Sequence, residues 1–328
     1  MKACVFDGRA ARVVLDHPEP EVRAGEVRVR VRLAGVCRTD LEIVKGYMNF
    51  RGVLGHEFVG VAEGGRHAGR RVVGDINCPC GTCDLCREGL PTHCRRRTVL
   101  GIQGRDGVFA EFLALPEANL HPVPDAVADE EAVFAEPLAA AVQIGRQVEF
   151  RPGEEVVVLG DGRLGQLVAQ VLRAWGVRPT VVGRSPAKLA ILAGLGIAAV
   201  AEGEARPSGE ARVVVECTGS PDGLAMALRF VRPRGIIVLK STVADTAGLN
   251  LAPIVVNEVT VVGSRCGPMG AALEMLARRE VQVAPLVTAV YTLDEAPEAL
   301  RAADRPDAIK VLIRVEPYAS GGAQRRPR

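Results

Sequence analysis

The sequence lacks an excess of charge of either sign, and it lacks a long hydrophobic run. Its 41 Lys and Arg residues nearly balance 39 Asp and Glu residues, so the net charge of +2 provides no strong field for nucleic acid or an acidic membrane. No apolar run reaches the roughly 18 residues of a membrane-spanning helix, and the N-terminal segment enters a strand pattern without a secretory leader. We therefore expect a cytoplasmic protein that binds neither nucleic acid nor membranes.

Internal repeats and low-complexity tracts are also missing, which argues against a solenoid and against extended disorder. The 328 residues are 48% hydrophobic and 24% charged, an ordinary composition for a globular protein. A chain of this length predicts two domains, each large enough to bury its own core.

The first third of the chain is predicted to be mostly β-structure with little helix. Residues 26–33 alternate apolar and charged side chains, as in a half-exposed strand. Short apolar runs follow at residues 58–62, 71–73 and 108–115, separated by loops that contain glycine and proline.

The character of the sequence changes near residue 130. Residues 129–148 have a helical pattern, and an alternation of buried strands and helices follows as far as the segment VTVVGS. This alternation indicates an α/β domain with a parallel, doubly wound sheet. The last strand pattern, AIKVLIRV, is predicted to return to the first domain. We therefore expect a discontinuous domain of residues 1–133 and 285–328, with a disordered tail at 317–328, and a second domain of residues 134–284.

A glycine-rich turn opens the second domain. Gly160, Gly162 and Gly165 form G-x-G-x-x-G after a buried strand and before a helix, which is the context of a dinucleotide-binding turn. The helix N-terminus would face the cofactor phosphates. Arg163 and Leu164 lie within the same turn and are predicted to contact the cofactor.

The end of the next strand bears on the choice between NAD and NADP. An acid there would bind the ribose 2′-hydroxyl, whereas arginine can receive a 2′-phosphate. The strand ends in Val-Val-Gly followed by Arg184 and Ser185, with Lys188 one turn further on. We favour NADP over NAD; the alternative is that Arg184 is a solvated loop charge.

Cysteine usage points to metal binding. The nine cysteines are odd in number, and five of them lie within seventeen residues, which in a reducing compartment favours metal ligation over disulfides. A closed tetrahedral site needs four thiolates and has no open position. Cys78 lies outside the set that we predict to hold a structural zinc, which is Cys80, Cys83, Cys86 and Cys94.

A second group of residues has the composition of a metal site with an open position. Cys37 lies in GVCRTD, and His56 and Glu57 lie in GHE. A catalytic zinc has about three protein ligands and leaves one position for substrate. Each motif is weak alone and becomes informative beside the cysteine loop and the glycine turn.

Together these motifs resemble those of the zinc-containing medium-chain dehydrogenases, the family of alcohol, sorbitol, glucose and threonine dehydrogenases. The resemblance covers residues 1 to about 315 and rests on the order GVCRTD, GHE, the cysteine loop, EPLA, GDGRLG, ECTGS and a final K-V-x-I strand. It implies a GroES-like β-barrel catalytic domain interrupted by a Rossmann domain, with the active site between them.

The resemblance also implies ligands for the catalytic zinc. Cys37 and His56 match the first two, and Glu136 of AEPLAA stands where alcohol dehydrogenases have a cysteine, as in the sorbitol and glucose branch. Glu57 is similar to the glutamate that can move onto the zinc. The alternative for Glu136 is a carboxylate favoured by a helix N-terminus.

Further roles follow from the same resemblance. Thr39 matches the hydroxyl that passes on the substrate proton, and Asp40 matches the carboxylate that orients the zinc-bound histidine. Arg38 matches a pyrophosphate-binding arginine, whereas Glu42 replaces the relay histidine of several members, which leaves the outer end of the proton path open. The remaining positions that match cofactor contacts are Cys217, Thr218 and Lys310.

We thus expect two zinc ions per chain and hydride transfer between a nicotinamide cofactor and a small alcohol or polyol, by a homodimer or homotetramer. Two alternatives are a threonine-type amino-alcohol dehydrogenase and a zinc-stabilised NADP-binding protein without turnover. The intact Cys37, Thr39, His56 and Glu136 argue against the second, because a sensor needs no open metal position.

Overall fold

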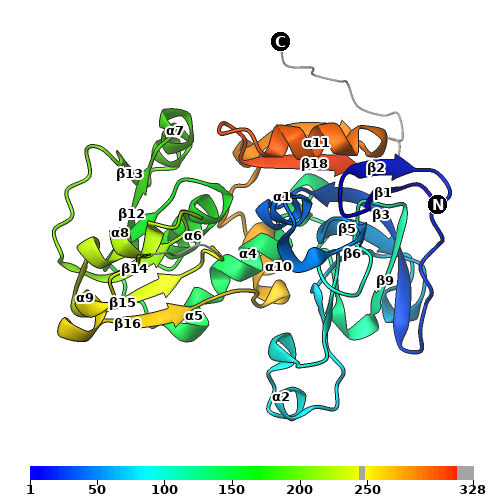
Figure 1. The fold of residues 1–328 in the computed structure, drawn as a ribbon, viewed down its shortest axis with the longest axis horizontal. Helices are drawn as coiled ribbons and strands as arrows, with labels where there is room; N and C mark the ends of the chain where they lie inside the picture. Colours follow the sequence, from blue (N-terminus) through cyan, green and yellow to red (C-terminus); the bar gives the residue numbers. More distant parts are fainter. Residues whose placement is uncertain (244–247, 316–328) are drawn as a thin grey trace.

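The computed structural model describes residues 1–243 and 248–315. One half of the molecule is built on mainly antiparallel sheets, in which only β17 and β18 form a parallel pair among the described residues, and the other on a parallel sheet, with α4 (Ala135–Val142) and α10 (Met269–Ala277) between them (Figure 1). The predicted disordered tail, residues 317–328, lies outside the described residues.

The first half contains a three-stranded sheet in the order β2-β1-β4 and a seven-stranded sheet in the order β10-β6-β5-β3-β18-β17, with β9 beside β3. Their bounds are β1 Ala3–Phe6, β2 Ala11–Val14, β3 Glu26–Gly35, β4 Gly52–Val53, β5 Glu57–Ala62, β6 Arg71–Gly74, β9 Phe112–Pro116, β10 Leu120–Pro122, β17 Val287–Thr292 and β18 Lys310–Arg314. β18 pairs antiparallel with β3, so the prediction that the last strand returns to the first half is confirmed.

The second half is a six-stranded, all-parallel sheet in the order β13-β12-β11-β14-β15-β16. The strands are β11 Glu155–Leu159, β12 Arg178–Gly183, β13 Ala198–Ala201, β14 Ala211–Glu216, β15 Val231–Leu239 and β16 Thr260–Gly263. The connecting helices are α6 Arg163–Ala174, α7 Pro186–Gly194, α8 Gly223–Phe230 and α9 Ala252–Val256. This strand order is that of the Rossmann fold, so the predicted doubly wound sheet is confirmed.

The helical segment predicted at 129–148 is divided into α3 (Asp129–Ala132), α4 and α5 (Ile144–Gln147). Pro137 has no N–H to donate to the carbonyl four residues earlier, which interrupts the helix before α4. Among the helices that were not predicted are α1 (Arg38–Val44), α10 and α11 (Ala296–Ala303). The N-terminus of α1 is fixed locally, because Asp40 accepts a hydrogen bond from the backbone of Cys37 at 2.8 Å.

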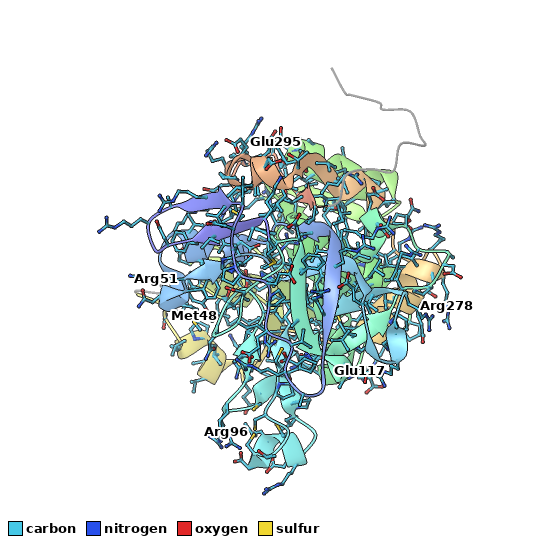
Figure 2. All side chains as sticks on the ribbon, turned by 90° about the vertical axis from the view of Figure 1, so that its right-hand side faces the viewer. Met48, Arg51, Arg96, Glu117, Arg278 and Glu295 are labelled. Atoms are coloured by element: carbon cyan, nitrogen blue, oxygen red, sulfur yellow. The ribbon has the colours of Figure 1, made fainter. Side chains whose placement is uncertain are left out.

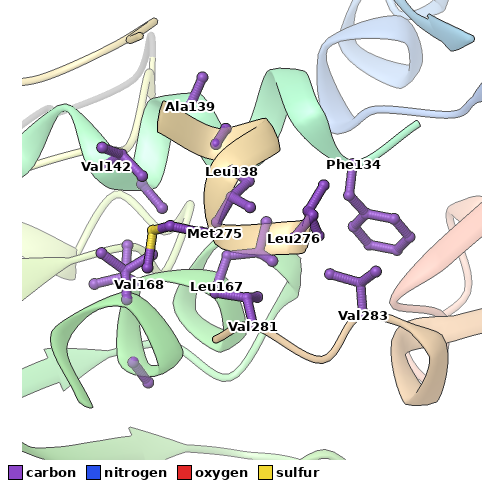
Figure 3. Packing of buried hydrophobic residues seen from close by; sticks show 14 of the residues in the cluster. Phe134, Leu138, Ala139, Val142, Leu167, Val168, Met275, Leu276, Val281 and Val283 are labelled. Atoms are coloured by element: carbon purple, nitrogen blue, oxygen red, sulfur yellow. The ribbon is translucent and has the colours of Figure 1, made fainter. Parts of the chain in front are cut away.

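Helices α4, α6 and α10 join the two halves through a shared hydrophobic core. Leu138 of α4, Leu167 and Val168 of α6, and Met275 and Leu276 of α10 are buried in one cluster (Figure 3). Their burial fixes α4, which carries a candidate metal ligand, against the parallel sheet. Within the described ranges, no helix is both long and apolar enough to cross a lipid bilayer.

Candidate metal centres and cofactor cleft

The first candidate metal centre is formed by Cys37, His56 and Glu57. Their ligand atoms all lie within 4.8 Å of one another. The antiparallel register of β3 and β5 pairs Gly35 with Glu57, which brings the GHE motif beside the start of α1. A thiolate, an imidazole and a carboxylate that lie next to one another are the kind of ligands that hold a catalytic zinc, so the three residues fit such an ion.

Asp40 organises two of these groups. One carboxylate oxygen lies 3.1 Å from Nδ1 of His56, and the other accepts the Cys37 N–H. The histidine therefore keeps Nε2 for a metal, with the carboxylate fixing the ring orientation. Asp40 has no exposed surface, so this arrangement is held away from water.

The charges around Cys37 favour a thiolate. Burial acts to raise the pKa of Cys37, but the neighbouring Arg163 and His56 outweigh it and lower the pKa to about 5. Burial acts to lower the pKa of His56, and the negative charges of Asp40 and Cys37 reverse this and raise it well above 6.5. The thiol is thus prepared to bind a cation.

Glu136, the predicted third ligand, lies in the first turn of α4 but outside the set of ligand atoms within 4.8 Å. Burial raises the pKa of Glu136 to about 7, and the nearby Cys37 adds to this effect while His56 opposes it. The structure therefore brings Glu57 closest to Cys37 and His56, with Glu136 near enough to feel both charges.

Glu57 is paired with a cation that the sequence did not connect to it. Lys310 at the start of β18 forms an ion pair with Glu57, and neither side chain has exposed surface. The Lys310 ammonium also lies 3.4 Å from the carbonyl of Val36 and 5.5 Å from the ring centre of Phe134. The predicted contact of Lys310 with the cofactor stays a prediction, because the structure directs its charge to Glu57.

The polar residues of α1 are divided between the interior and the surface. Thr39 Oγ1 lies 3.8 Å from Cys37 Sγ, next to the candidate metal centre. Arg38 and Glu42 form a 2.9 Å ion pair on the exposed face, where Asp304 and Lys45 complete the network. The structure brings Thr39 to the cluster and leaves Glu42 at the surface.

The second candidate centre is the projecting lobe that carries α2 (Asp84–Arg87) and is closed at its base by β7 (Asn77–Cys78) and β8 (Thr98–Val99) (Figures 1 and 2). The sulfur of Cys83 lies 3.5 Å from that of Cys86 and 3.7 Å from that of Cys94, and Cys94 lies 3.5 Å from Cys80. Zinc–sulfur bonds of about 2.3 Å place tetrahedral sulfurs about 3.8 Å apart, so the four residues fit a zinc ion. The N–H groups of Cys80 and Arg96 point at the Cys94 sulfur, at 3.3 and 3.4 Å.

The glycine turn has the geometry of a phosphate-binding turn. Gly160 has a φ of +105°, and a Cβ there would meet the carbonyl of Cys217, whereas a Cβ on Gly165 would collide with the Gly160 carbonyl. Gly162, at the N-terminus of α6, faces open space. A pyrophosphate can approach this backbone, so the residues fit a dinucleotide.

Arg163, in the first position of α6, extends away from this turn toward the metal centre. Its guanidinium donates to the Val36 carbonyl at 2.9 Å and lies 2.9 Å from Cys37 Sγ and 3.6 Å from Glu57. Leu164 packs against the core of the parallel sheet. The cofactor-binding helix is therefore tied directly to the first candidate centre.

The loop after β14 contains the other two predicted cofactor residues. The N–H of Cys217 donates to the carbonyl of Leu159 at 2.8 Å, which seats the loop beside the glycine turn. Thr218 donates from its N–H and its hydroxyl to the buried Glu216, at 2.7 and 2.5 Å. These bonds fix the loop shape and direct the N–H and the hydroxyl of Thr218 to Glu216.

A shallow depression of about 360 Å³ lies at the end of β12 and is lined by Gly183, Arg184, Ala201, Glu202 and Gly203. The Arg184 guanidinium is 67% exposed and pairs with Glu202 at 2.5 Å. Lys188 lies one turn further on with its side chain buried.

Asp161, inside the glycine motif, accepts the N–H groups of Arg184 and Ser185 at 2.9 and 2.6 Å. Sequence reasoning missed this residue, although its place between two motif glycines could have indicated a role. It also missed the buried Lys240, which stands in no motif.

Two family models match the chain. Residues 23–125 match the alcohol dehydrogenase GroES-like domain, and residues 164–278 match the zinc-binding dehydrogenase domain. The sorbitol dehydrogenase of Halalkalibacterium halodurans is 31% identical over 340 residues, covering 95% of this chain and 99% of the relative. An L-threonine 3-dehydrogenase of Streptomyces avermitilis is 32% identical over 307 residues, covering 85% and 88%.

Solved structures agree with these matches. The alcohol dehydrogenase TADH from Thermus sp. ATN1 has a TM-score of 0.87 at 30% identity and covers 96% of this chain and all of its own. RspB from Escherichia coli CFT073, complexed with NADH, has a TM-score of 0.86 at 27% identity, covering 96% and 99%. A zinc-binding dehydrogenase from Sinorhizobium meliloti 1021, bound to NADP, has a TM-score of 0.83 at 27% identity, also covering 96% and 99%.

The likeness to these relatives extends over nearly the whole chain and includes both halves of its architecture. The chain belongs to the zinc-dependent medium-chain dehydrogenase family.

Proposed function

We propose that this chain, a zinc- and nicotinamide-dependent oxidoreductase acting on an alcohol or polyol, carries out its reaction at Cys37, His56 and Glu136. The observation that carries the proposal is the contact of Arg163 with Val36 and Cys37, because it joins the cofactor-binding helix to the cluster of metal ligands. The test is metal analysis together with an activity screen. Two zinc ions per chain and turnover of an alcohol would support the proposal. One zinc ion and no turnover would favour a zinc-stabilised NADP-binding protein instead.

The choice of Glu136 as third ligand rests on charge balance. Glu57 already has a counter-charge in Lys310, within a fully buried pair. The pKa of Glu136 is raised by burial to about 7, which means that its ionised form lacks comparable compensation. A zinc ion would supply the missing positive charge, and Glu57 would serve as the alternative ligand.

When bound, the zinc would polarise the substrate oxygen and the nicotinamide would exchange the hydride. Asp40 holds the His56 ring so that Nε2 faces the ion. Thr39 receives the substrate hydroxyl proton. Glu42, half-exposed and paired with Arg38, would be the outer end of the proton path to solvent.

The substrate class is a polyol or sugar alcohol. A glutamate as third ligand supports this class, as does the likeness to sorbitol dehydrogenase over 99% of that protein. The likeness to L-threonine 3-dehydrogenase supports an amino alcohol as the second candidate. A panel of alcohols, polyols, sugars and amino alcohols, scored by cofactor reduction, separates the two.

The preferred cofactor is NADP. Gly183 ends β12 without a side chain, so no acid stands there to bind a free 2′-hydroxyl, and Arg184 faces the adjoining depression. A 2′-phosphate would replace Glu202 as the partner of Arg184 through a charge-assisted bond. Asp161 and Glu202 both add negative charge near this position, so the preference depends on the charge of Arg184.

Arg184→Asp should therefore shift the preference from NADP toward NAD. A hydrogen bond to a charged group contributes about 1.5–3 kcal/mol, which corresponds to roughly a tenfold to hundredfold change. The measurement is the ratio of kcat/KM for NADP to that for NAD. Arg206→Asp is the control, because Arg206 is exposed nearby and bonds only to loop carbonyls. A wild-type preference for NAD, or an unchanged ratio in Arg184→Asp, would make Arg184 a solvated loop charge.

The chain assembles as a homodimer or homotetramer in the cytoplasm. Val255 and Val256 of α9 are 77% and 78% exposed, and Leu251 and Val261 beside them are also exposed. This apolar surface adjoins β16, the edge strand of the parallel sheet, and both features favour self-association. Nine free cysteines support a reducing compartment. Light scattering should give a mass of two or four chains, and a monomer would contradict the assembly.

A further inference from the structure

Lys240 is a buried cation that the reaction described above does not use. It follows β15 directly and is only 8% exposed. Its ammonium donates to the carbonyl of Ala140 at 2.7 Å and to the hydroxyl of Ser264 at 3.1 Å. Both partners are neutral, and burying a charge without a bonded counter-ion costs free energy of folding.

Lys240 is held between two elements, α4 and the loop that follows β16. Ala140 lies on α4, one turn after Glu136. Ser264 begins the loop after β16, where a Cβ on Gly267 would collide with the carbonyl of Ala139. Burial lowers the pKa of Lys240, and Cys217, Cys266 and Glu136 oppose that shift. The ammonium is therefore surrounded by the groups that line this end of the site.

The strand order indicates where each half of the cofactor would lie along the carboxyl edge of the parallel sheet. Arg184 follows β12 and Gly160 follows β11, so the adenosine and the pyrophosphate of a bound cofactor would lie over the ends of these strands. A cofactor that continues across the carboxyl edge next meets the ends of β14 and β15, where Cys217 and Lys240 lie. Lys240 thus stands between the nicotinamide half and α4, on the side of the metal centre.

The two redox forms of a nicotinamide ring differ in charge. The oxidised ring carries one positive charge, and the ring becomes neutral when the carbon–hydrogen bond of the alcohol breaks and its hydride binds the ring. The alcohol proton leaves separately, through Thr39. A fixed cation beside the ring repels only the oxidised form.

We propose that Lys240 is an electrostatic residue of the nicotinamide site, which makes the enzyme bind the reduced cofactor more tightly than the oxidised one. The ammonium thereby favours hydride transfer from the alcohol to the cofactor. This inference rests on the nicotinamide cofactor of the proposed function and does not depend on the choice between NAD and NADP.

The test measures the dissociation constants of both redox forms by calorimetry, with NADP⁺ and NADPH and in parallel with NAD⁺ and NADH. Lys240→Met removes the charge and keeps the length of the side chain. It should lower the ratio of the oxidised to the reduced dissociation constant by at least about tenfold, because unit charges about 12 Å apart already interact by that much at an effective dielectric constant of about 20, and closer charges by more. A purely structural role would change both constants by the same factor.

Lys188→Met is the matched control, because Lys188 is a buried lysine of the same domain at the adenosine end, which is identical in both redox forms. It should leave the ratio unchanged. A ratio within twofold of the wild type in Lys240→Met would overturn the inference, even if both constants rise. Lys240→Gln, which keeps a donor for Ala140, gives the same readout if the methionine variant does not fold. Failure of the wild type to bind either form would instead overturn the cofactor assignment, and this inference with it.

Discussion

Replacing His56 by alanine should abolish turnover, by at least about a thousandfold, while the chain stays folded. The imidazole is buried between Asp40 and Cys37, and in the proposed function it supplies one of three protein ligands to a doubly charged ion. Its loss leaves two ligands and an Asp40 carboxylate without its partner. Substrate polarisation is then lost with the metal, because no other group of the cluster can supply a comparable charge.

Metal analysis, melting temperature and kcat/KM of the same preparation together test this expectation. The variant should retain one zinc ion, held by the cysteine lobe, and a cooperative melting transition. His121→Ala is the matched control, since that histidine is half-buried on β10 and belongs to neither cluster, so two ions and near-normal activity should remain. Turnover preserved in His56→Ala, or loss of both ions, would remove the basis for a catalytic centre at this position.

Features encoded over short stretches of sequence could be predicted. The glycine turn and the cysteine loop each lie within about fifteen residues, and their chemistry is readable from spacing because local chain geometry brings the groups together. The strand-helix alternation likewise predicted the parallel sheet, since each crossover is a local unit. The proposed domain boundaries at residues 133 and 285 stay a prediction.

Contacts between distant segments could not be predicted in the same way. The pairing of Gly35 with Glu57 depends on sheet register, and the Lys310–Glu57 pair depends on β18 returning to β3. The sequence identified Lys310 as a family position and Arg163 as part of the turn, but gave no sign that both side chains extend to Glu57. A motif names the residue type, whereas the direction of a long side chain is decided by the charges that the fold places around it.

The choice of the third zinc ligand, Glu57 or Glu136, also depends on contacts between distant segments, and we base it on the charges around each carboxylate. Glu57 is adjacent to His56 in sequence and closest in space, yet it is already paired with Lys310. Glu136 comes from a different element, and no ion pair to it is found among the described residues, although the charges of His56 and Arg163 reach it. Proximity alone would favour Glu57, whereas our proposal of Glu136 rests on electrostatics.

Cys83→Ser should destabilise the cysteine lobe before it affects the chemistry. The lobe has one short helix and a two-stranded base, too little apolar surface to fold by burial alone, so the metal must supply much of its stability. A serine hydroxyl binds zinc poorly, and the other three cysteines lose the ion that holds them together. The sulfurs of Cys80 and Cys94, 3.5 Å apart, then repel each other as thiolates. Loss of a structural metal costs on the order of 4 kcal/mol or more.

Limited trypsin digestion gives the sharpest readout of this change, because the exposed Arg87, Arg95 and Arg96 lie within the lobe. Figure 2 labels Arg96 at this position. Cleavage at these sites, identified by mass spectrometry, should be at least about tenfold faster in Cys83→Ser than in the wild type. Cys78→Ser is the matched control: Cys78 lies just outside the four-cysteine set, so its variant should keep two zinc ions and resist cleavage. A Cys83→Ser chain that resists trypsin like the wild type would mean that the lobe folds without its metal. The four cysteines would then need another reason to lie 3.5–3.7 Å apart.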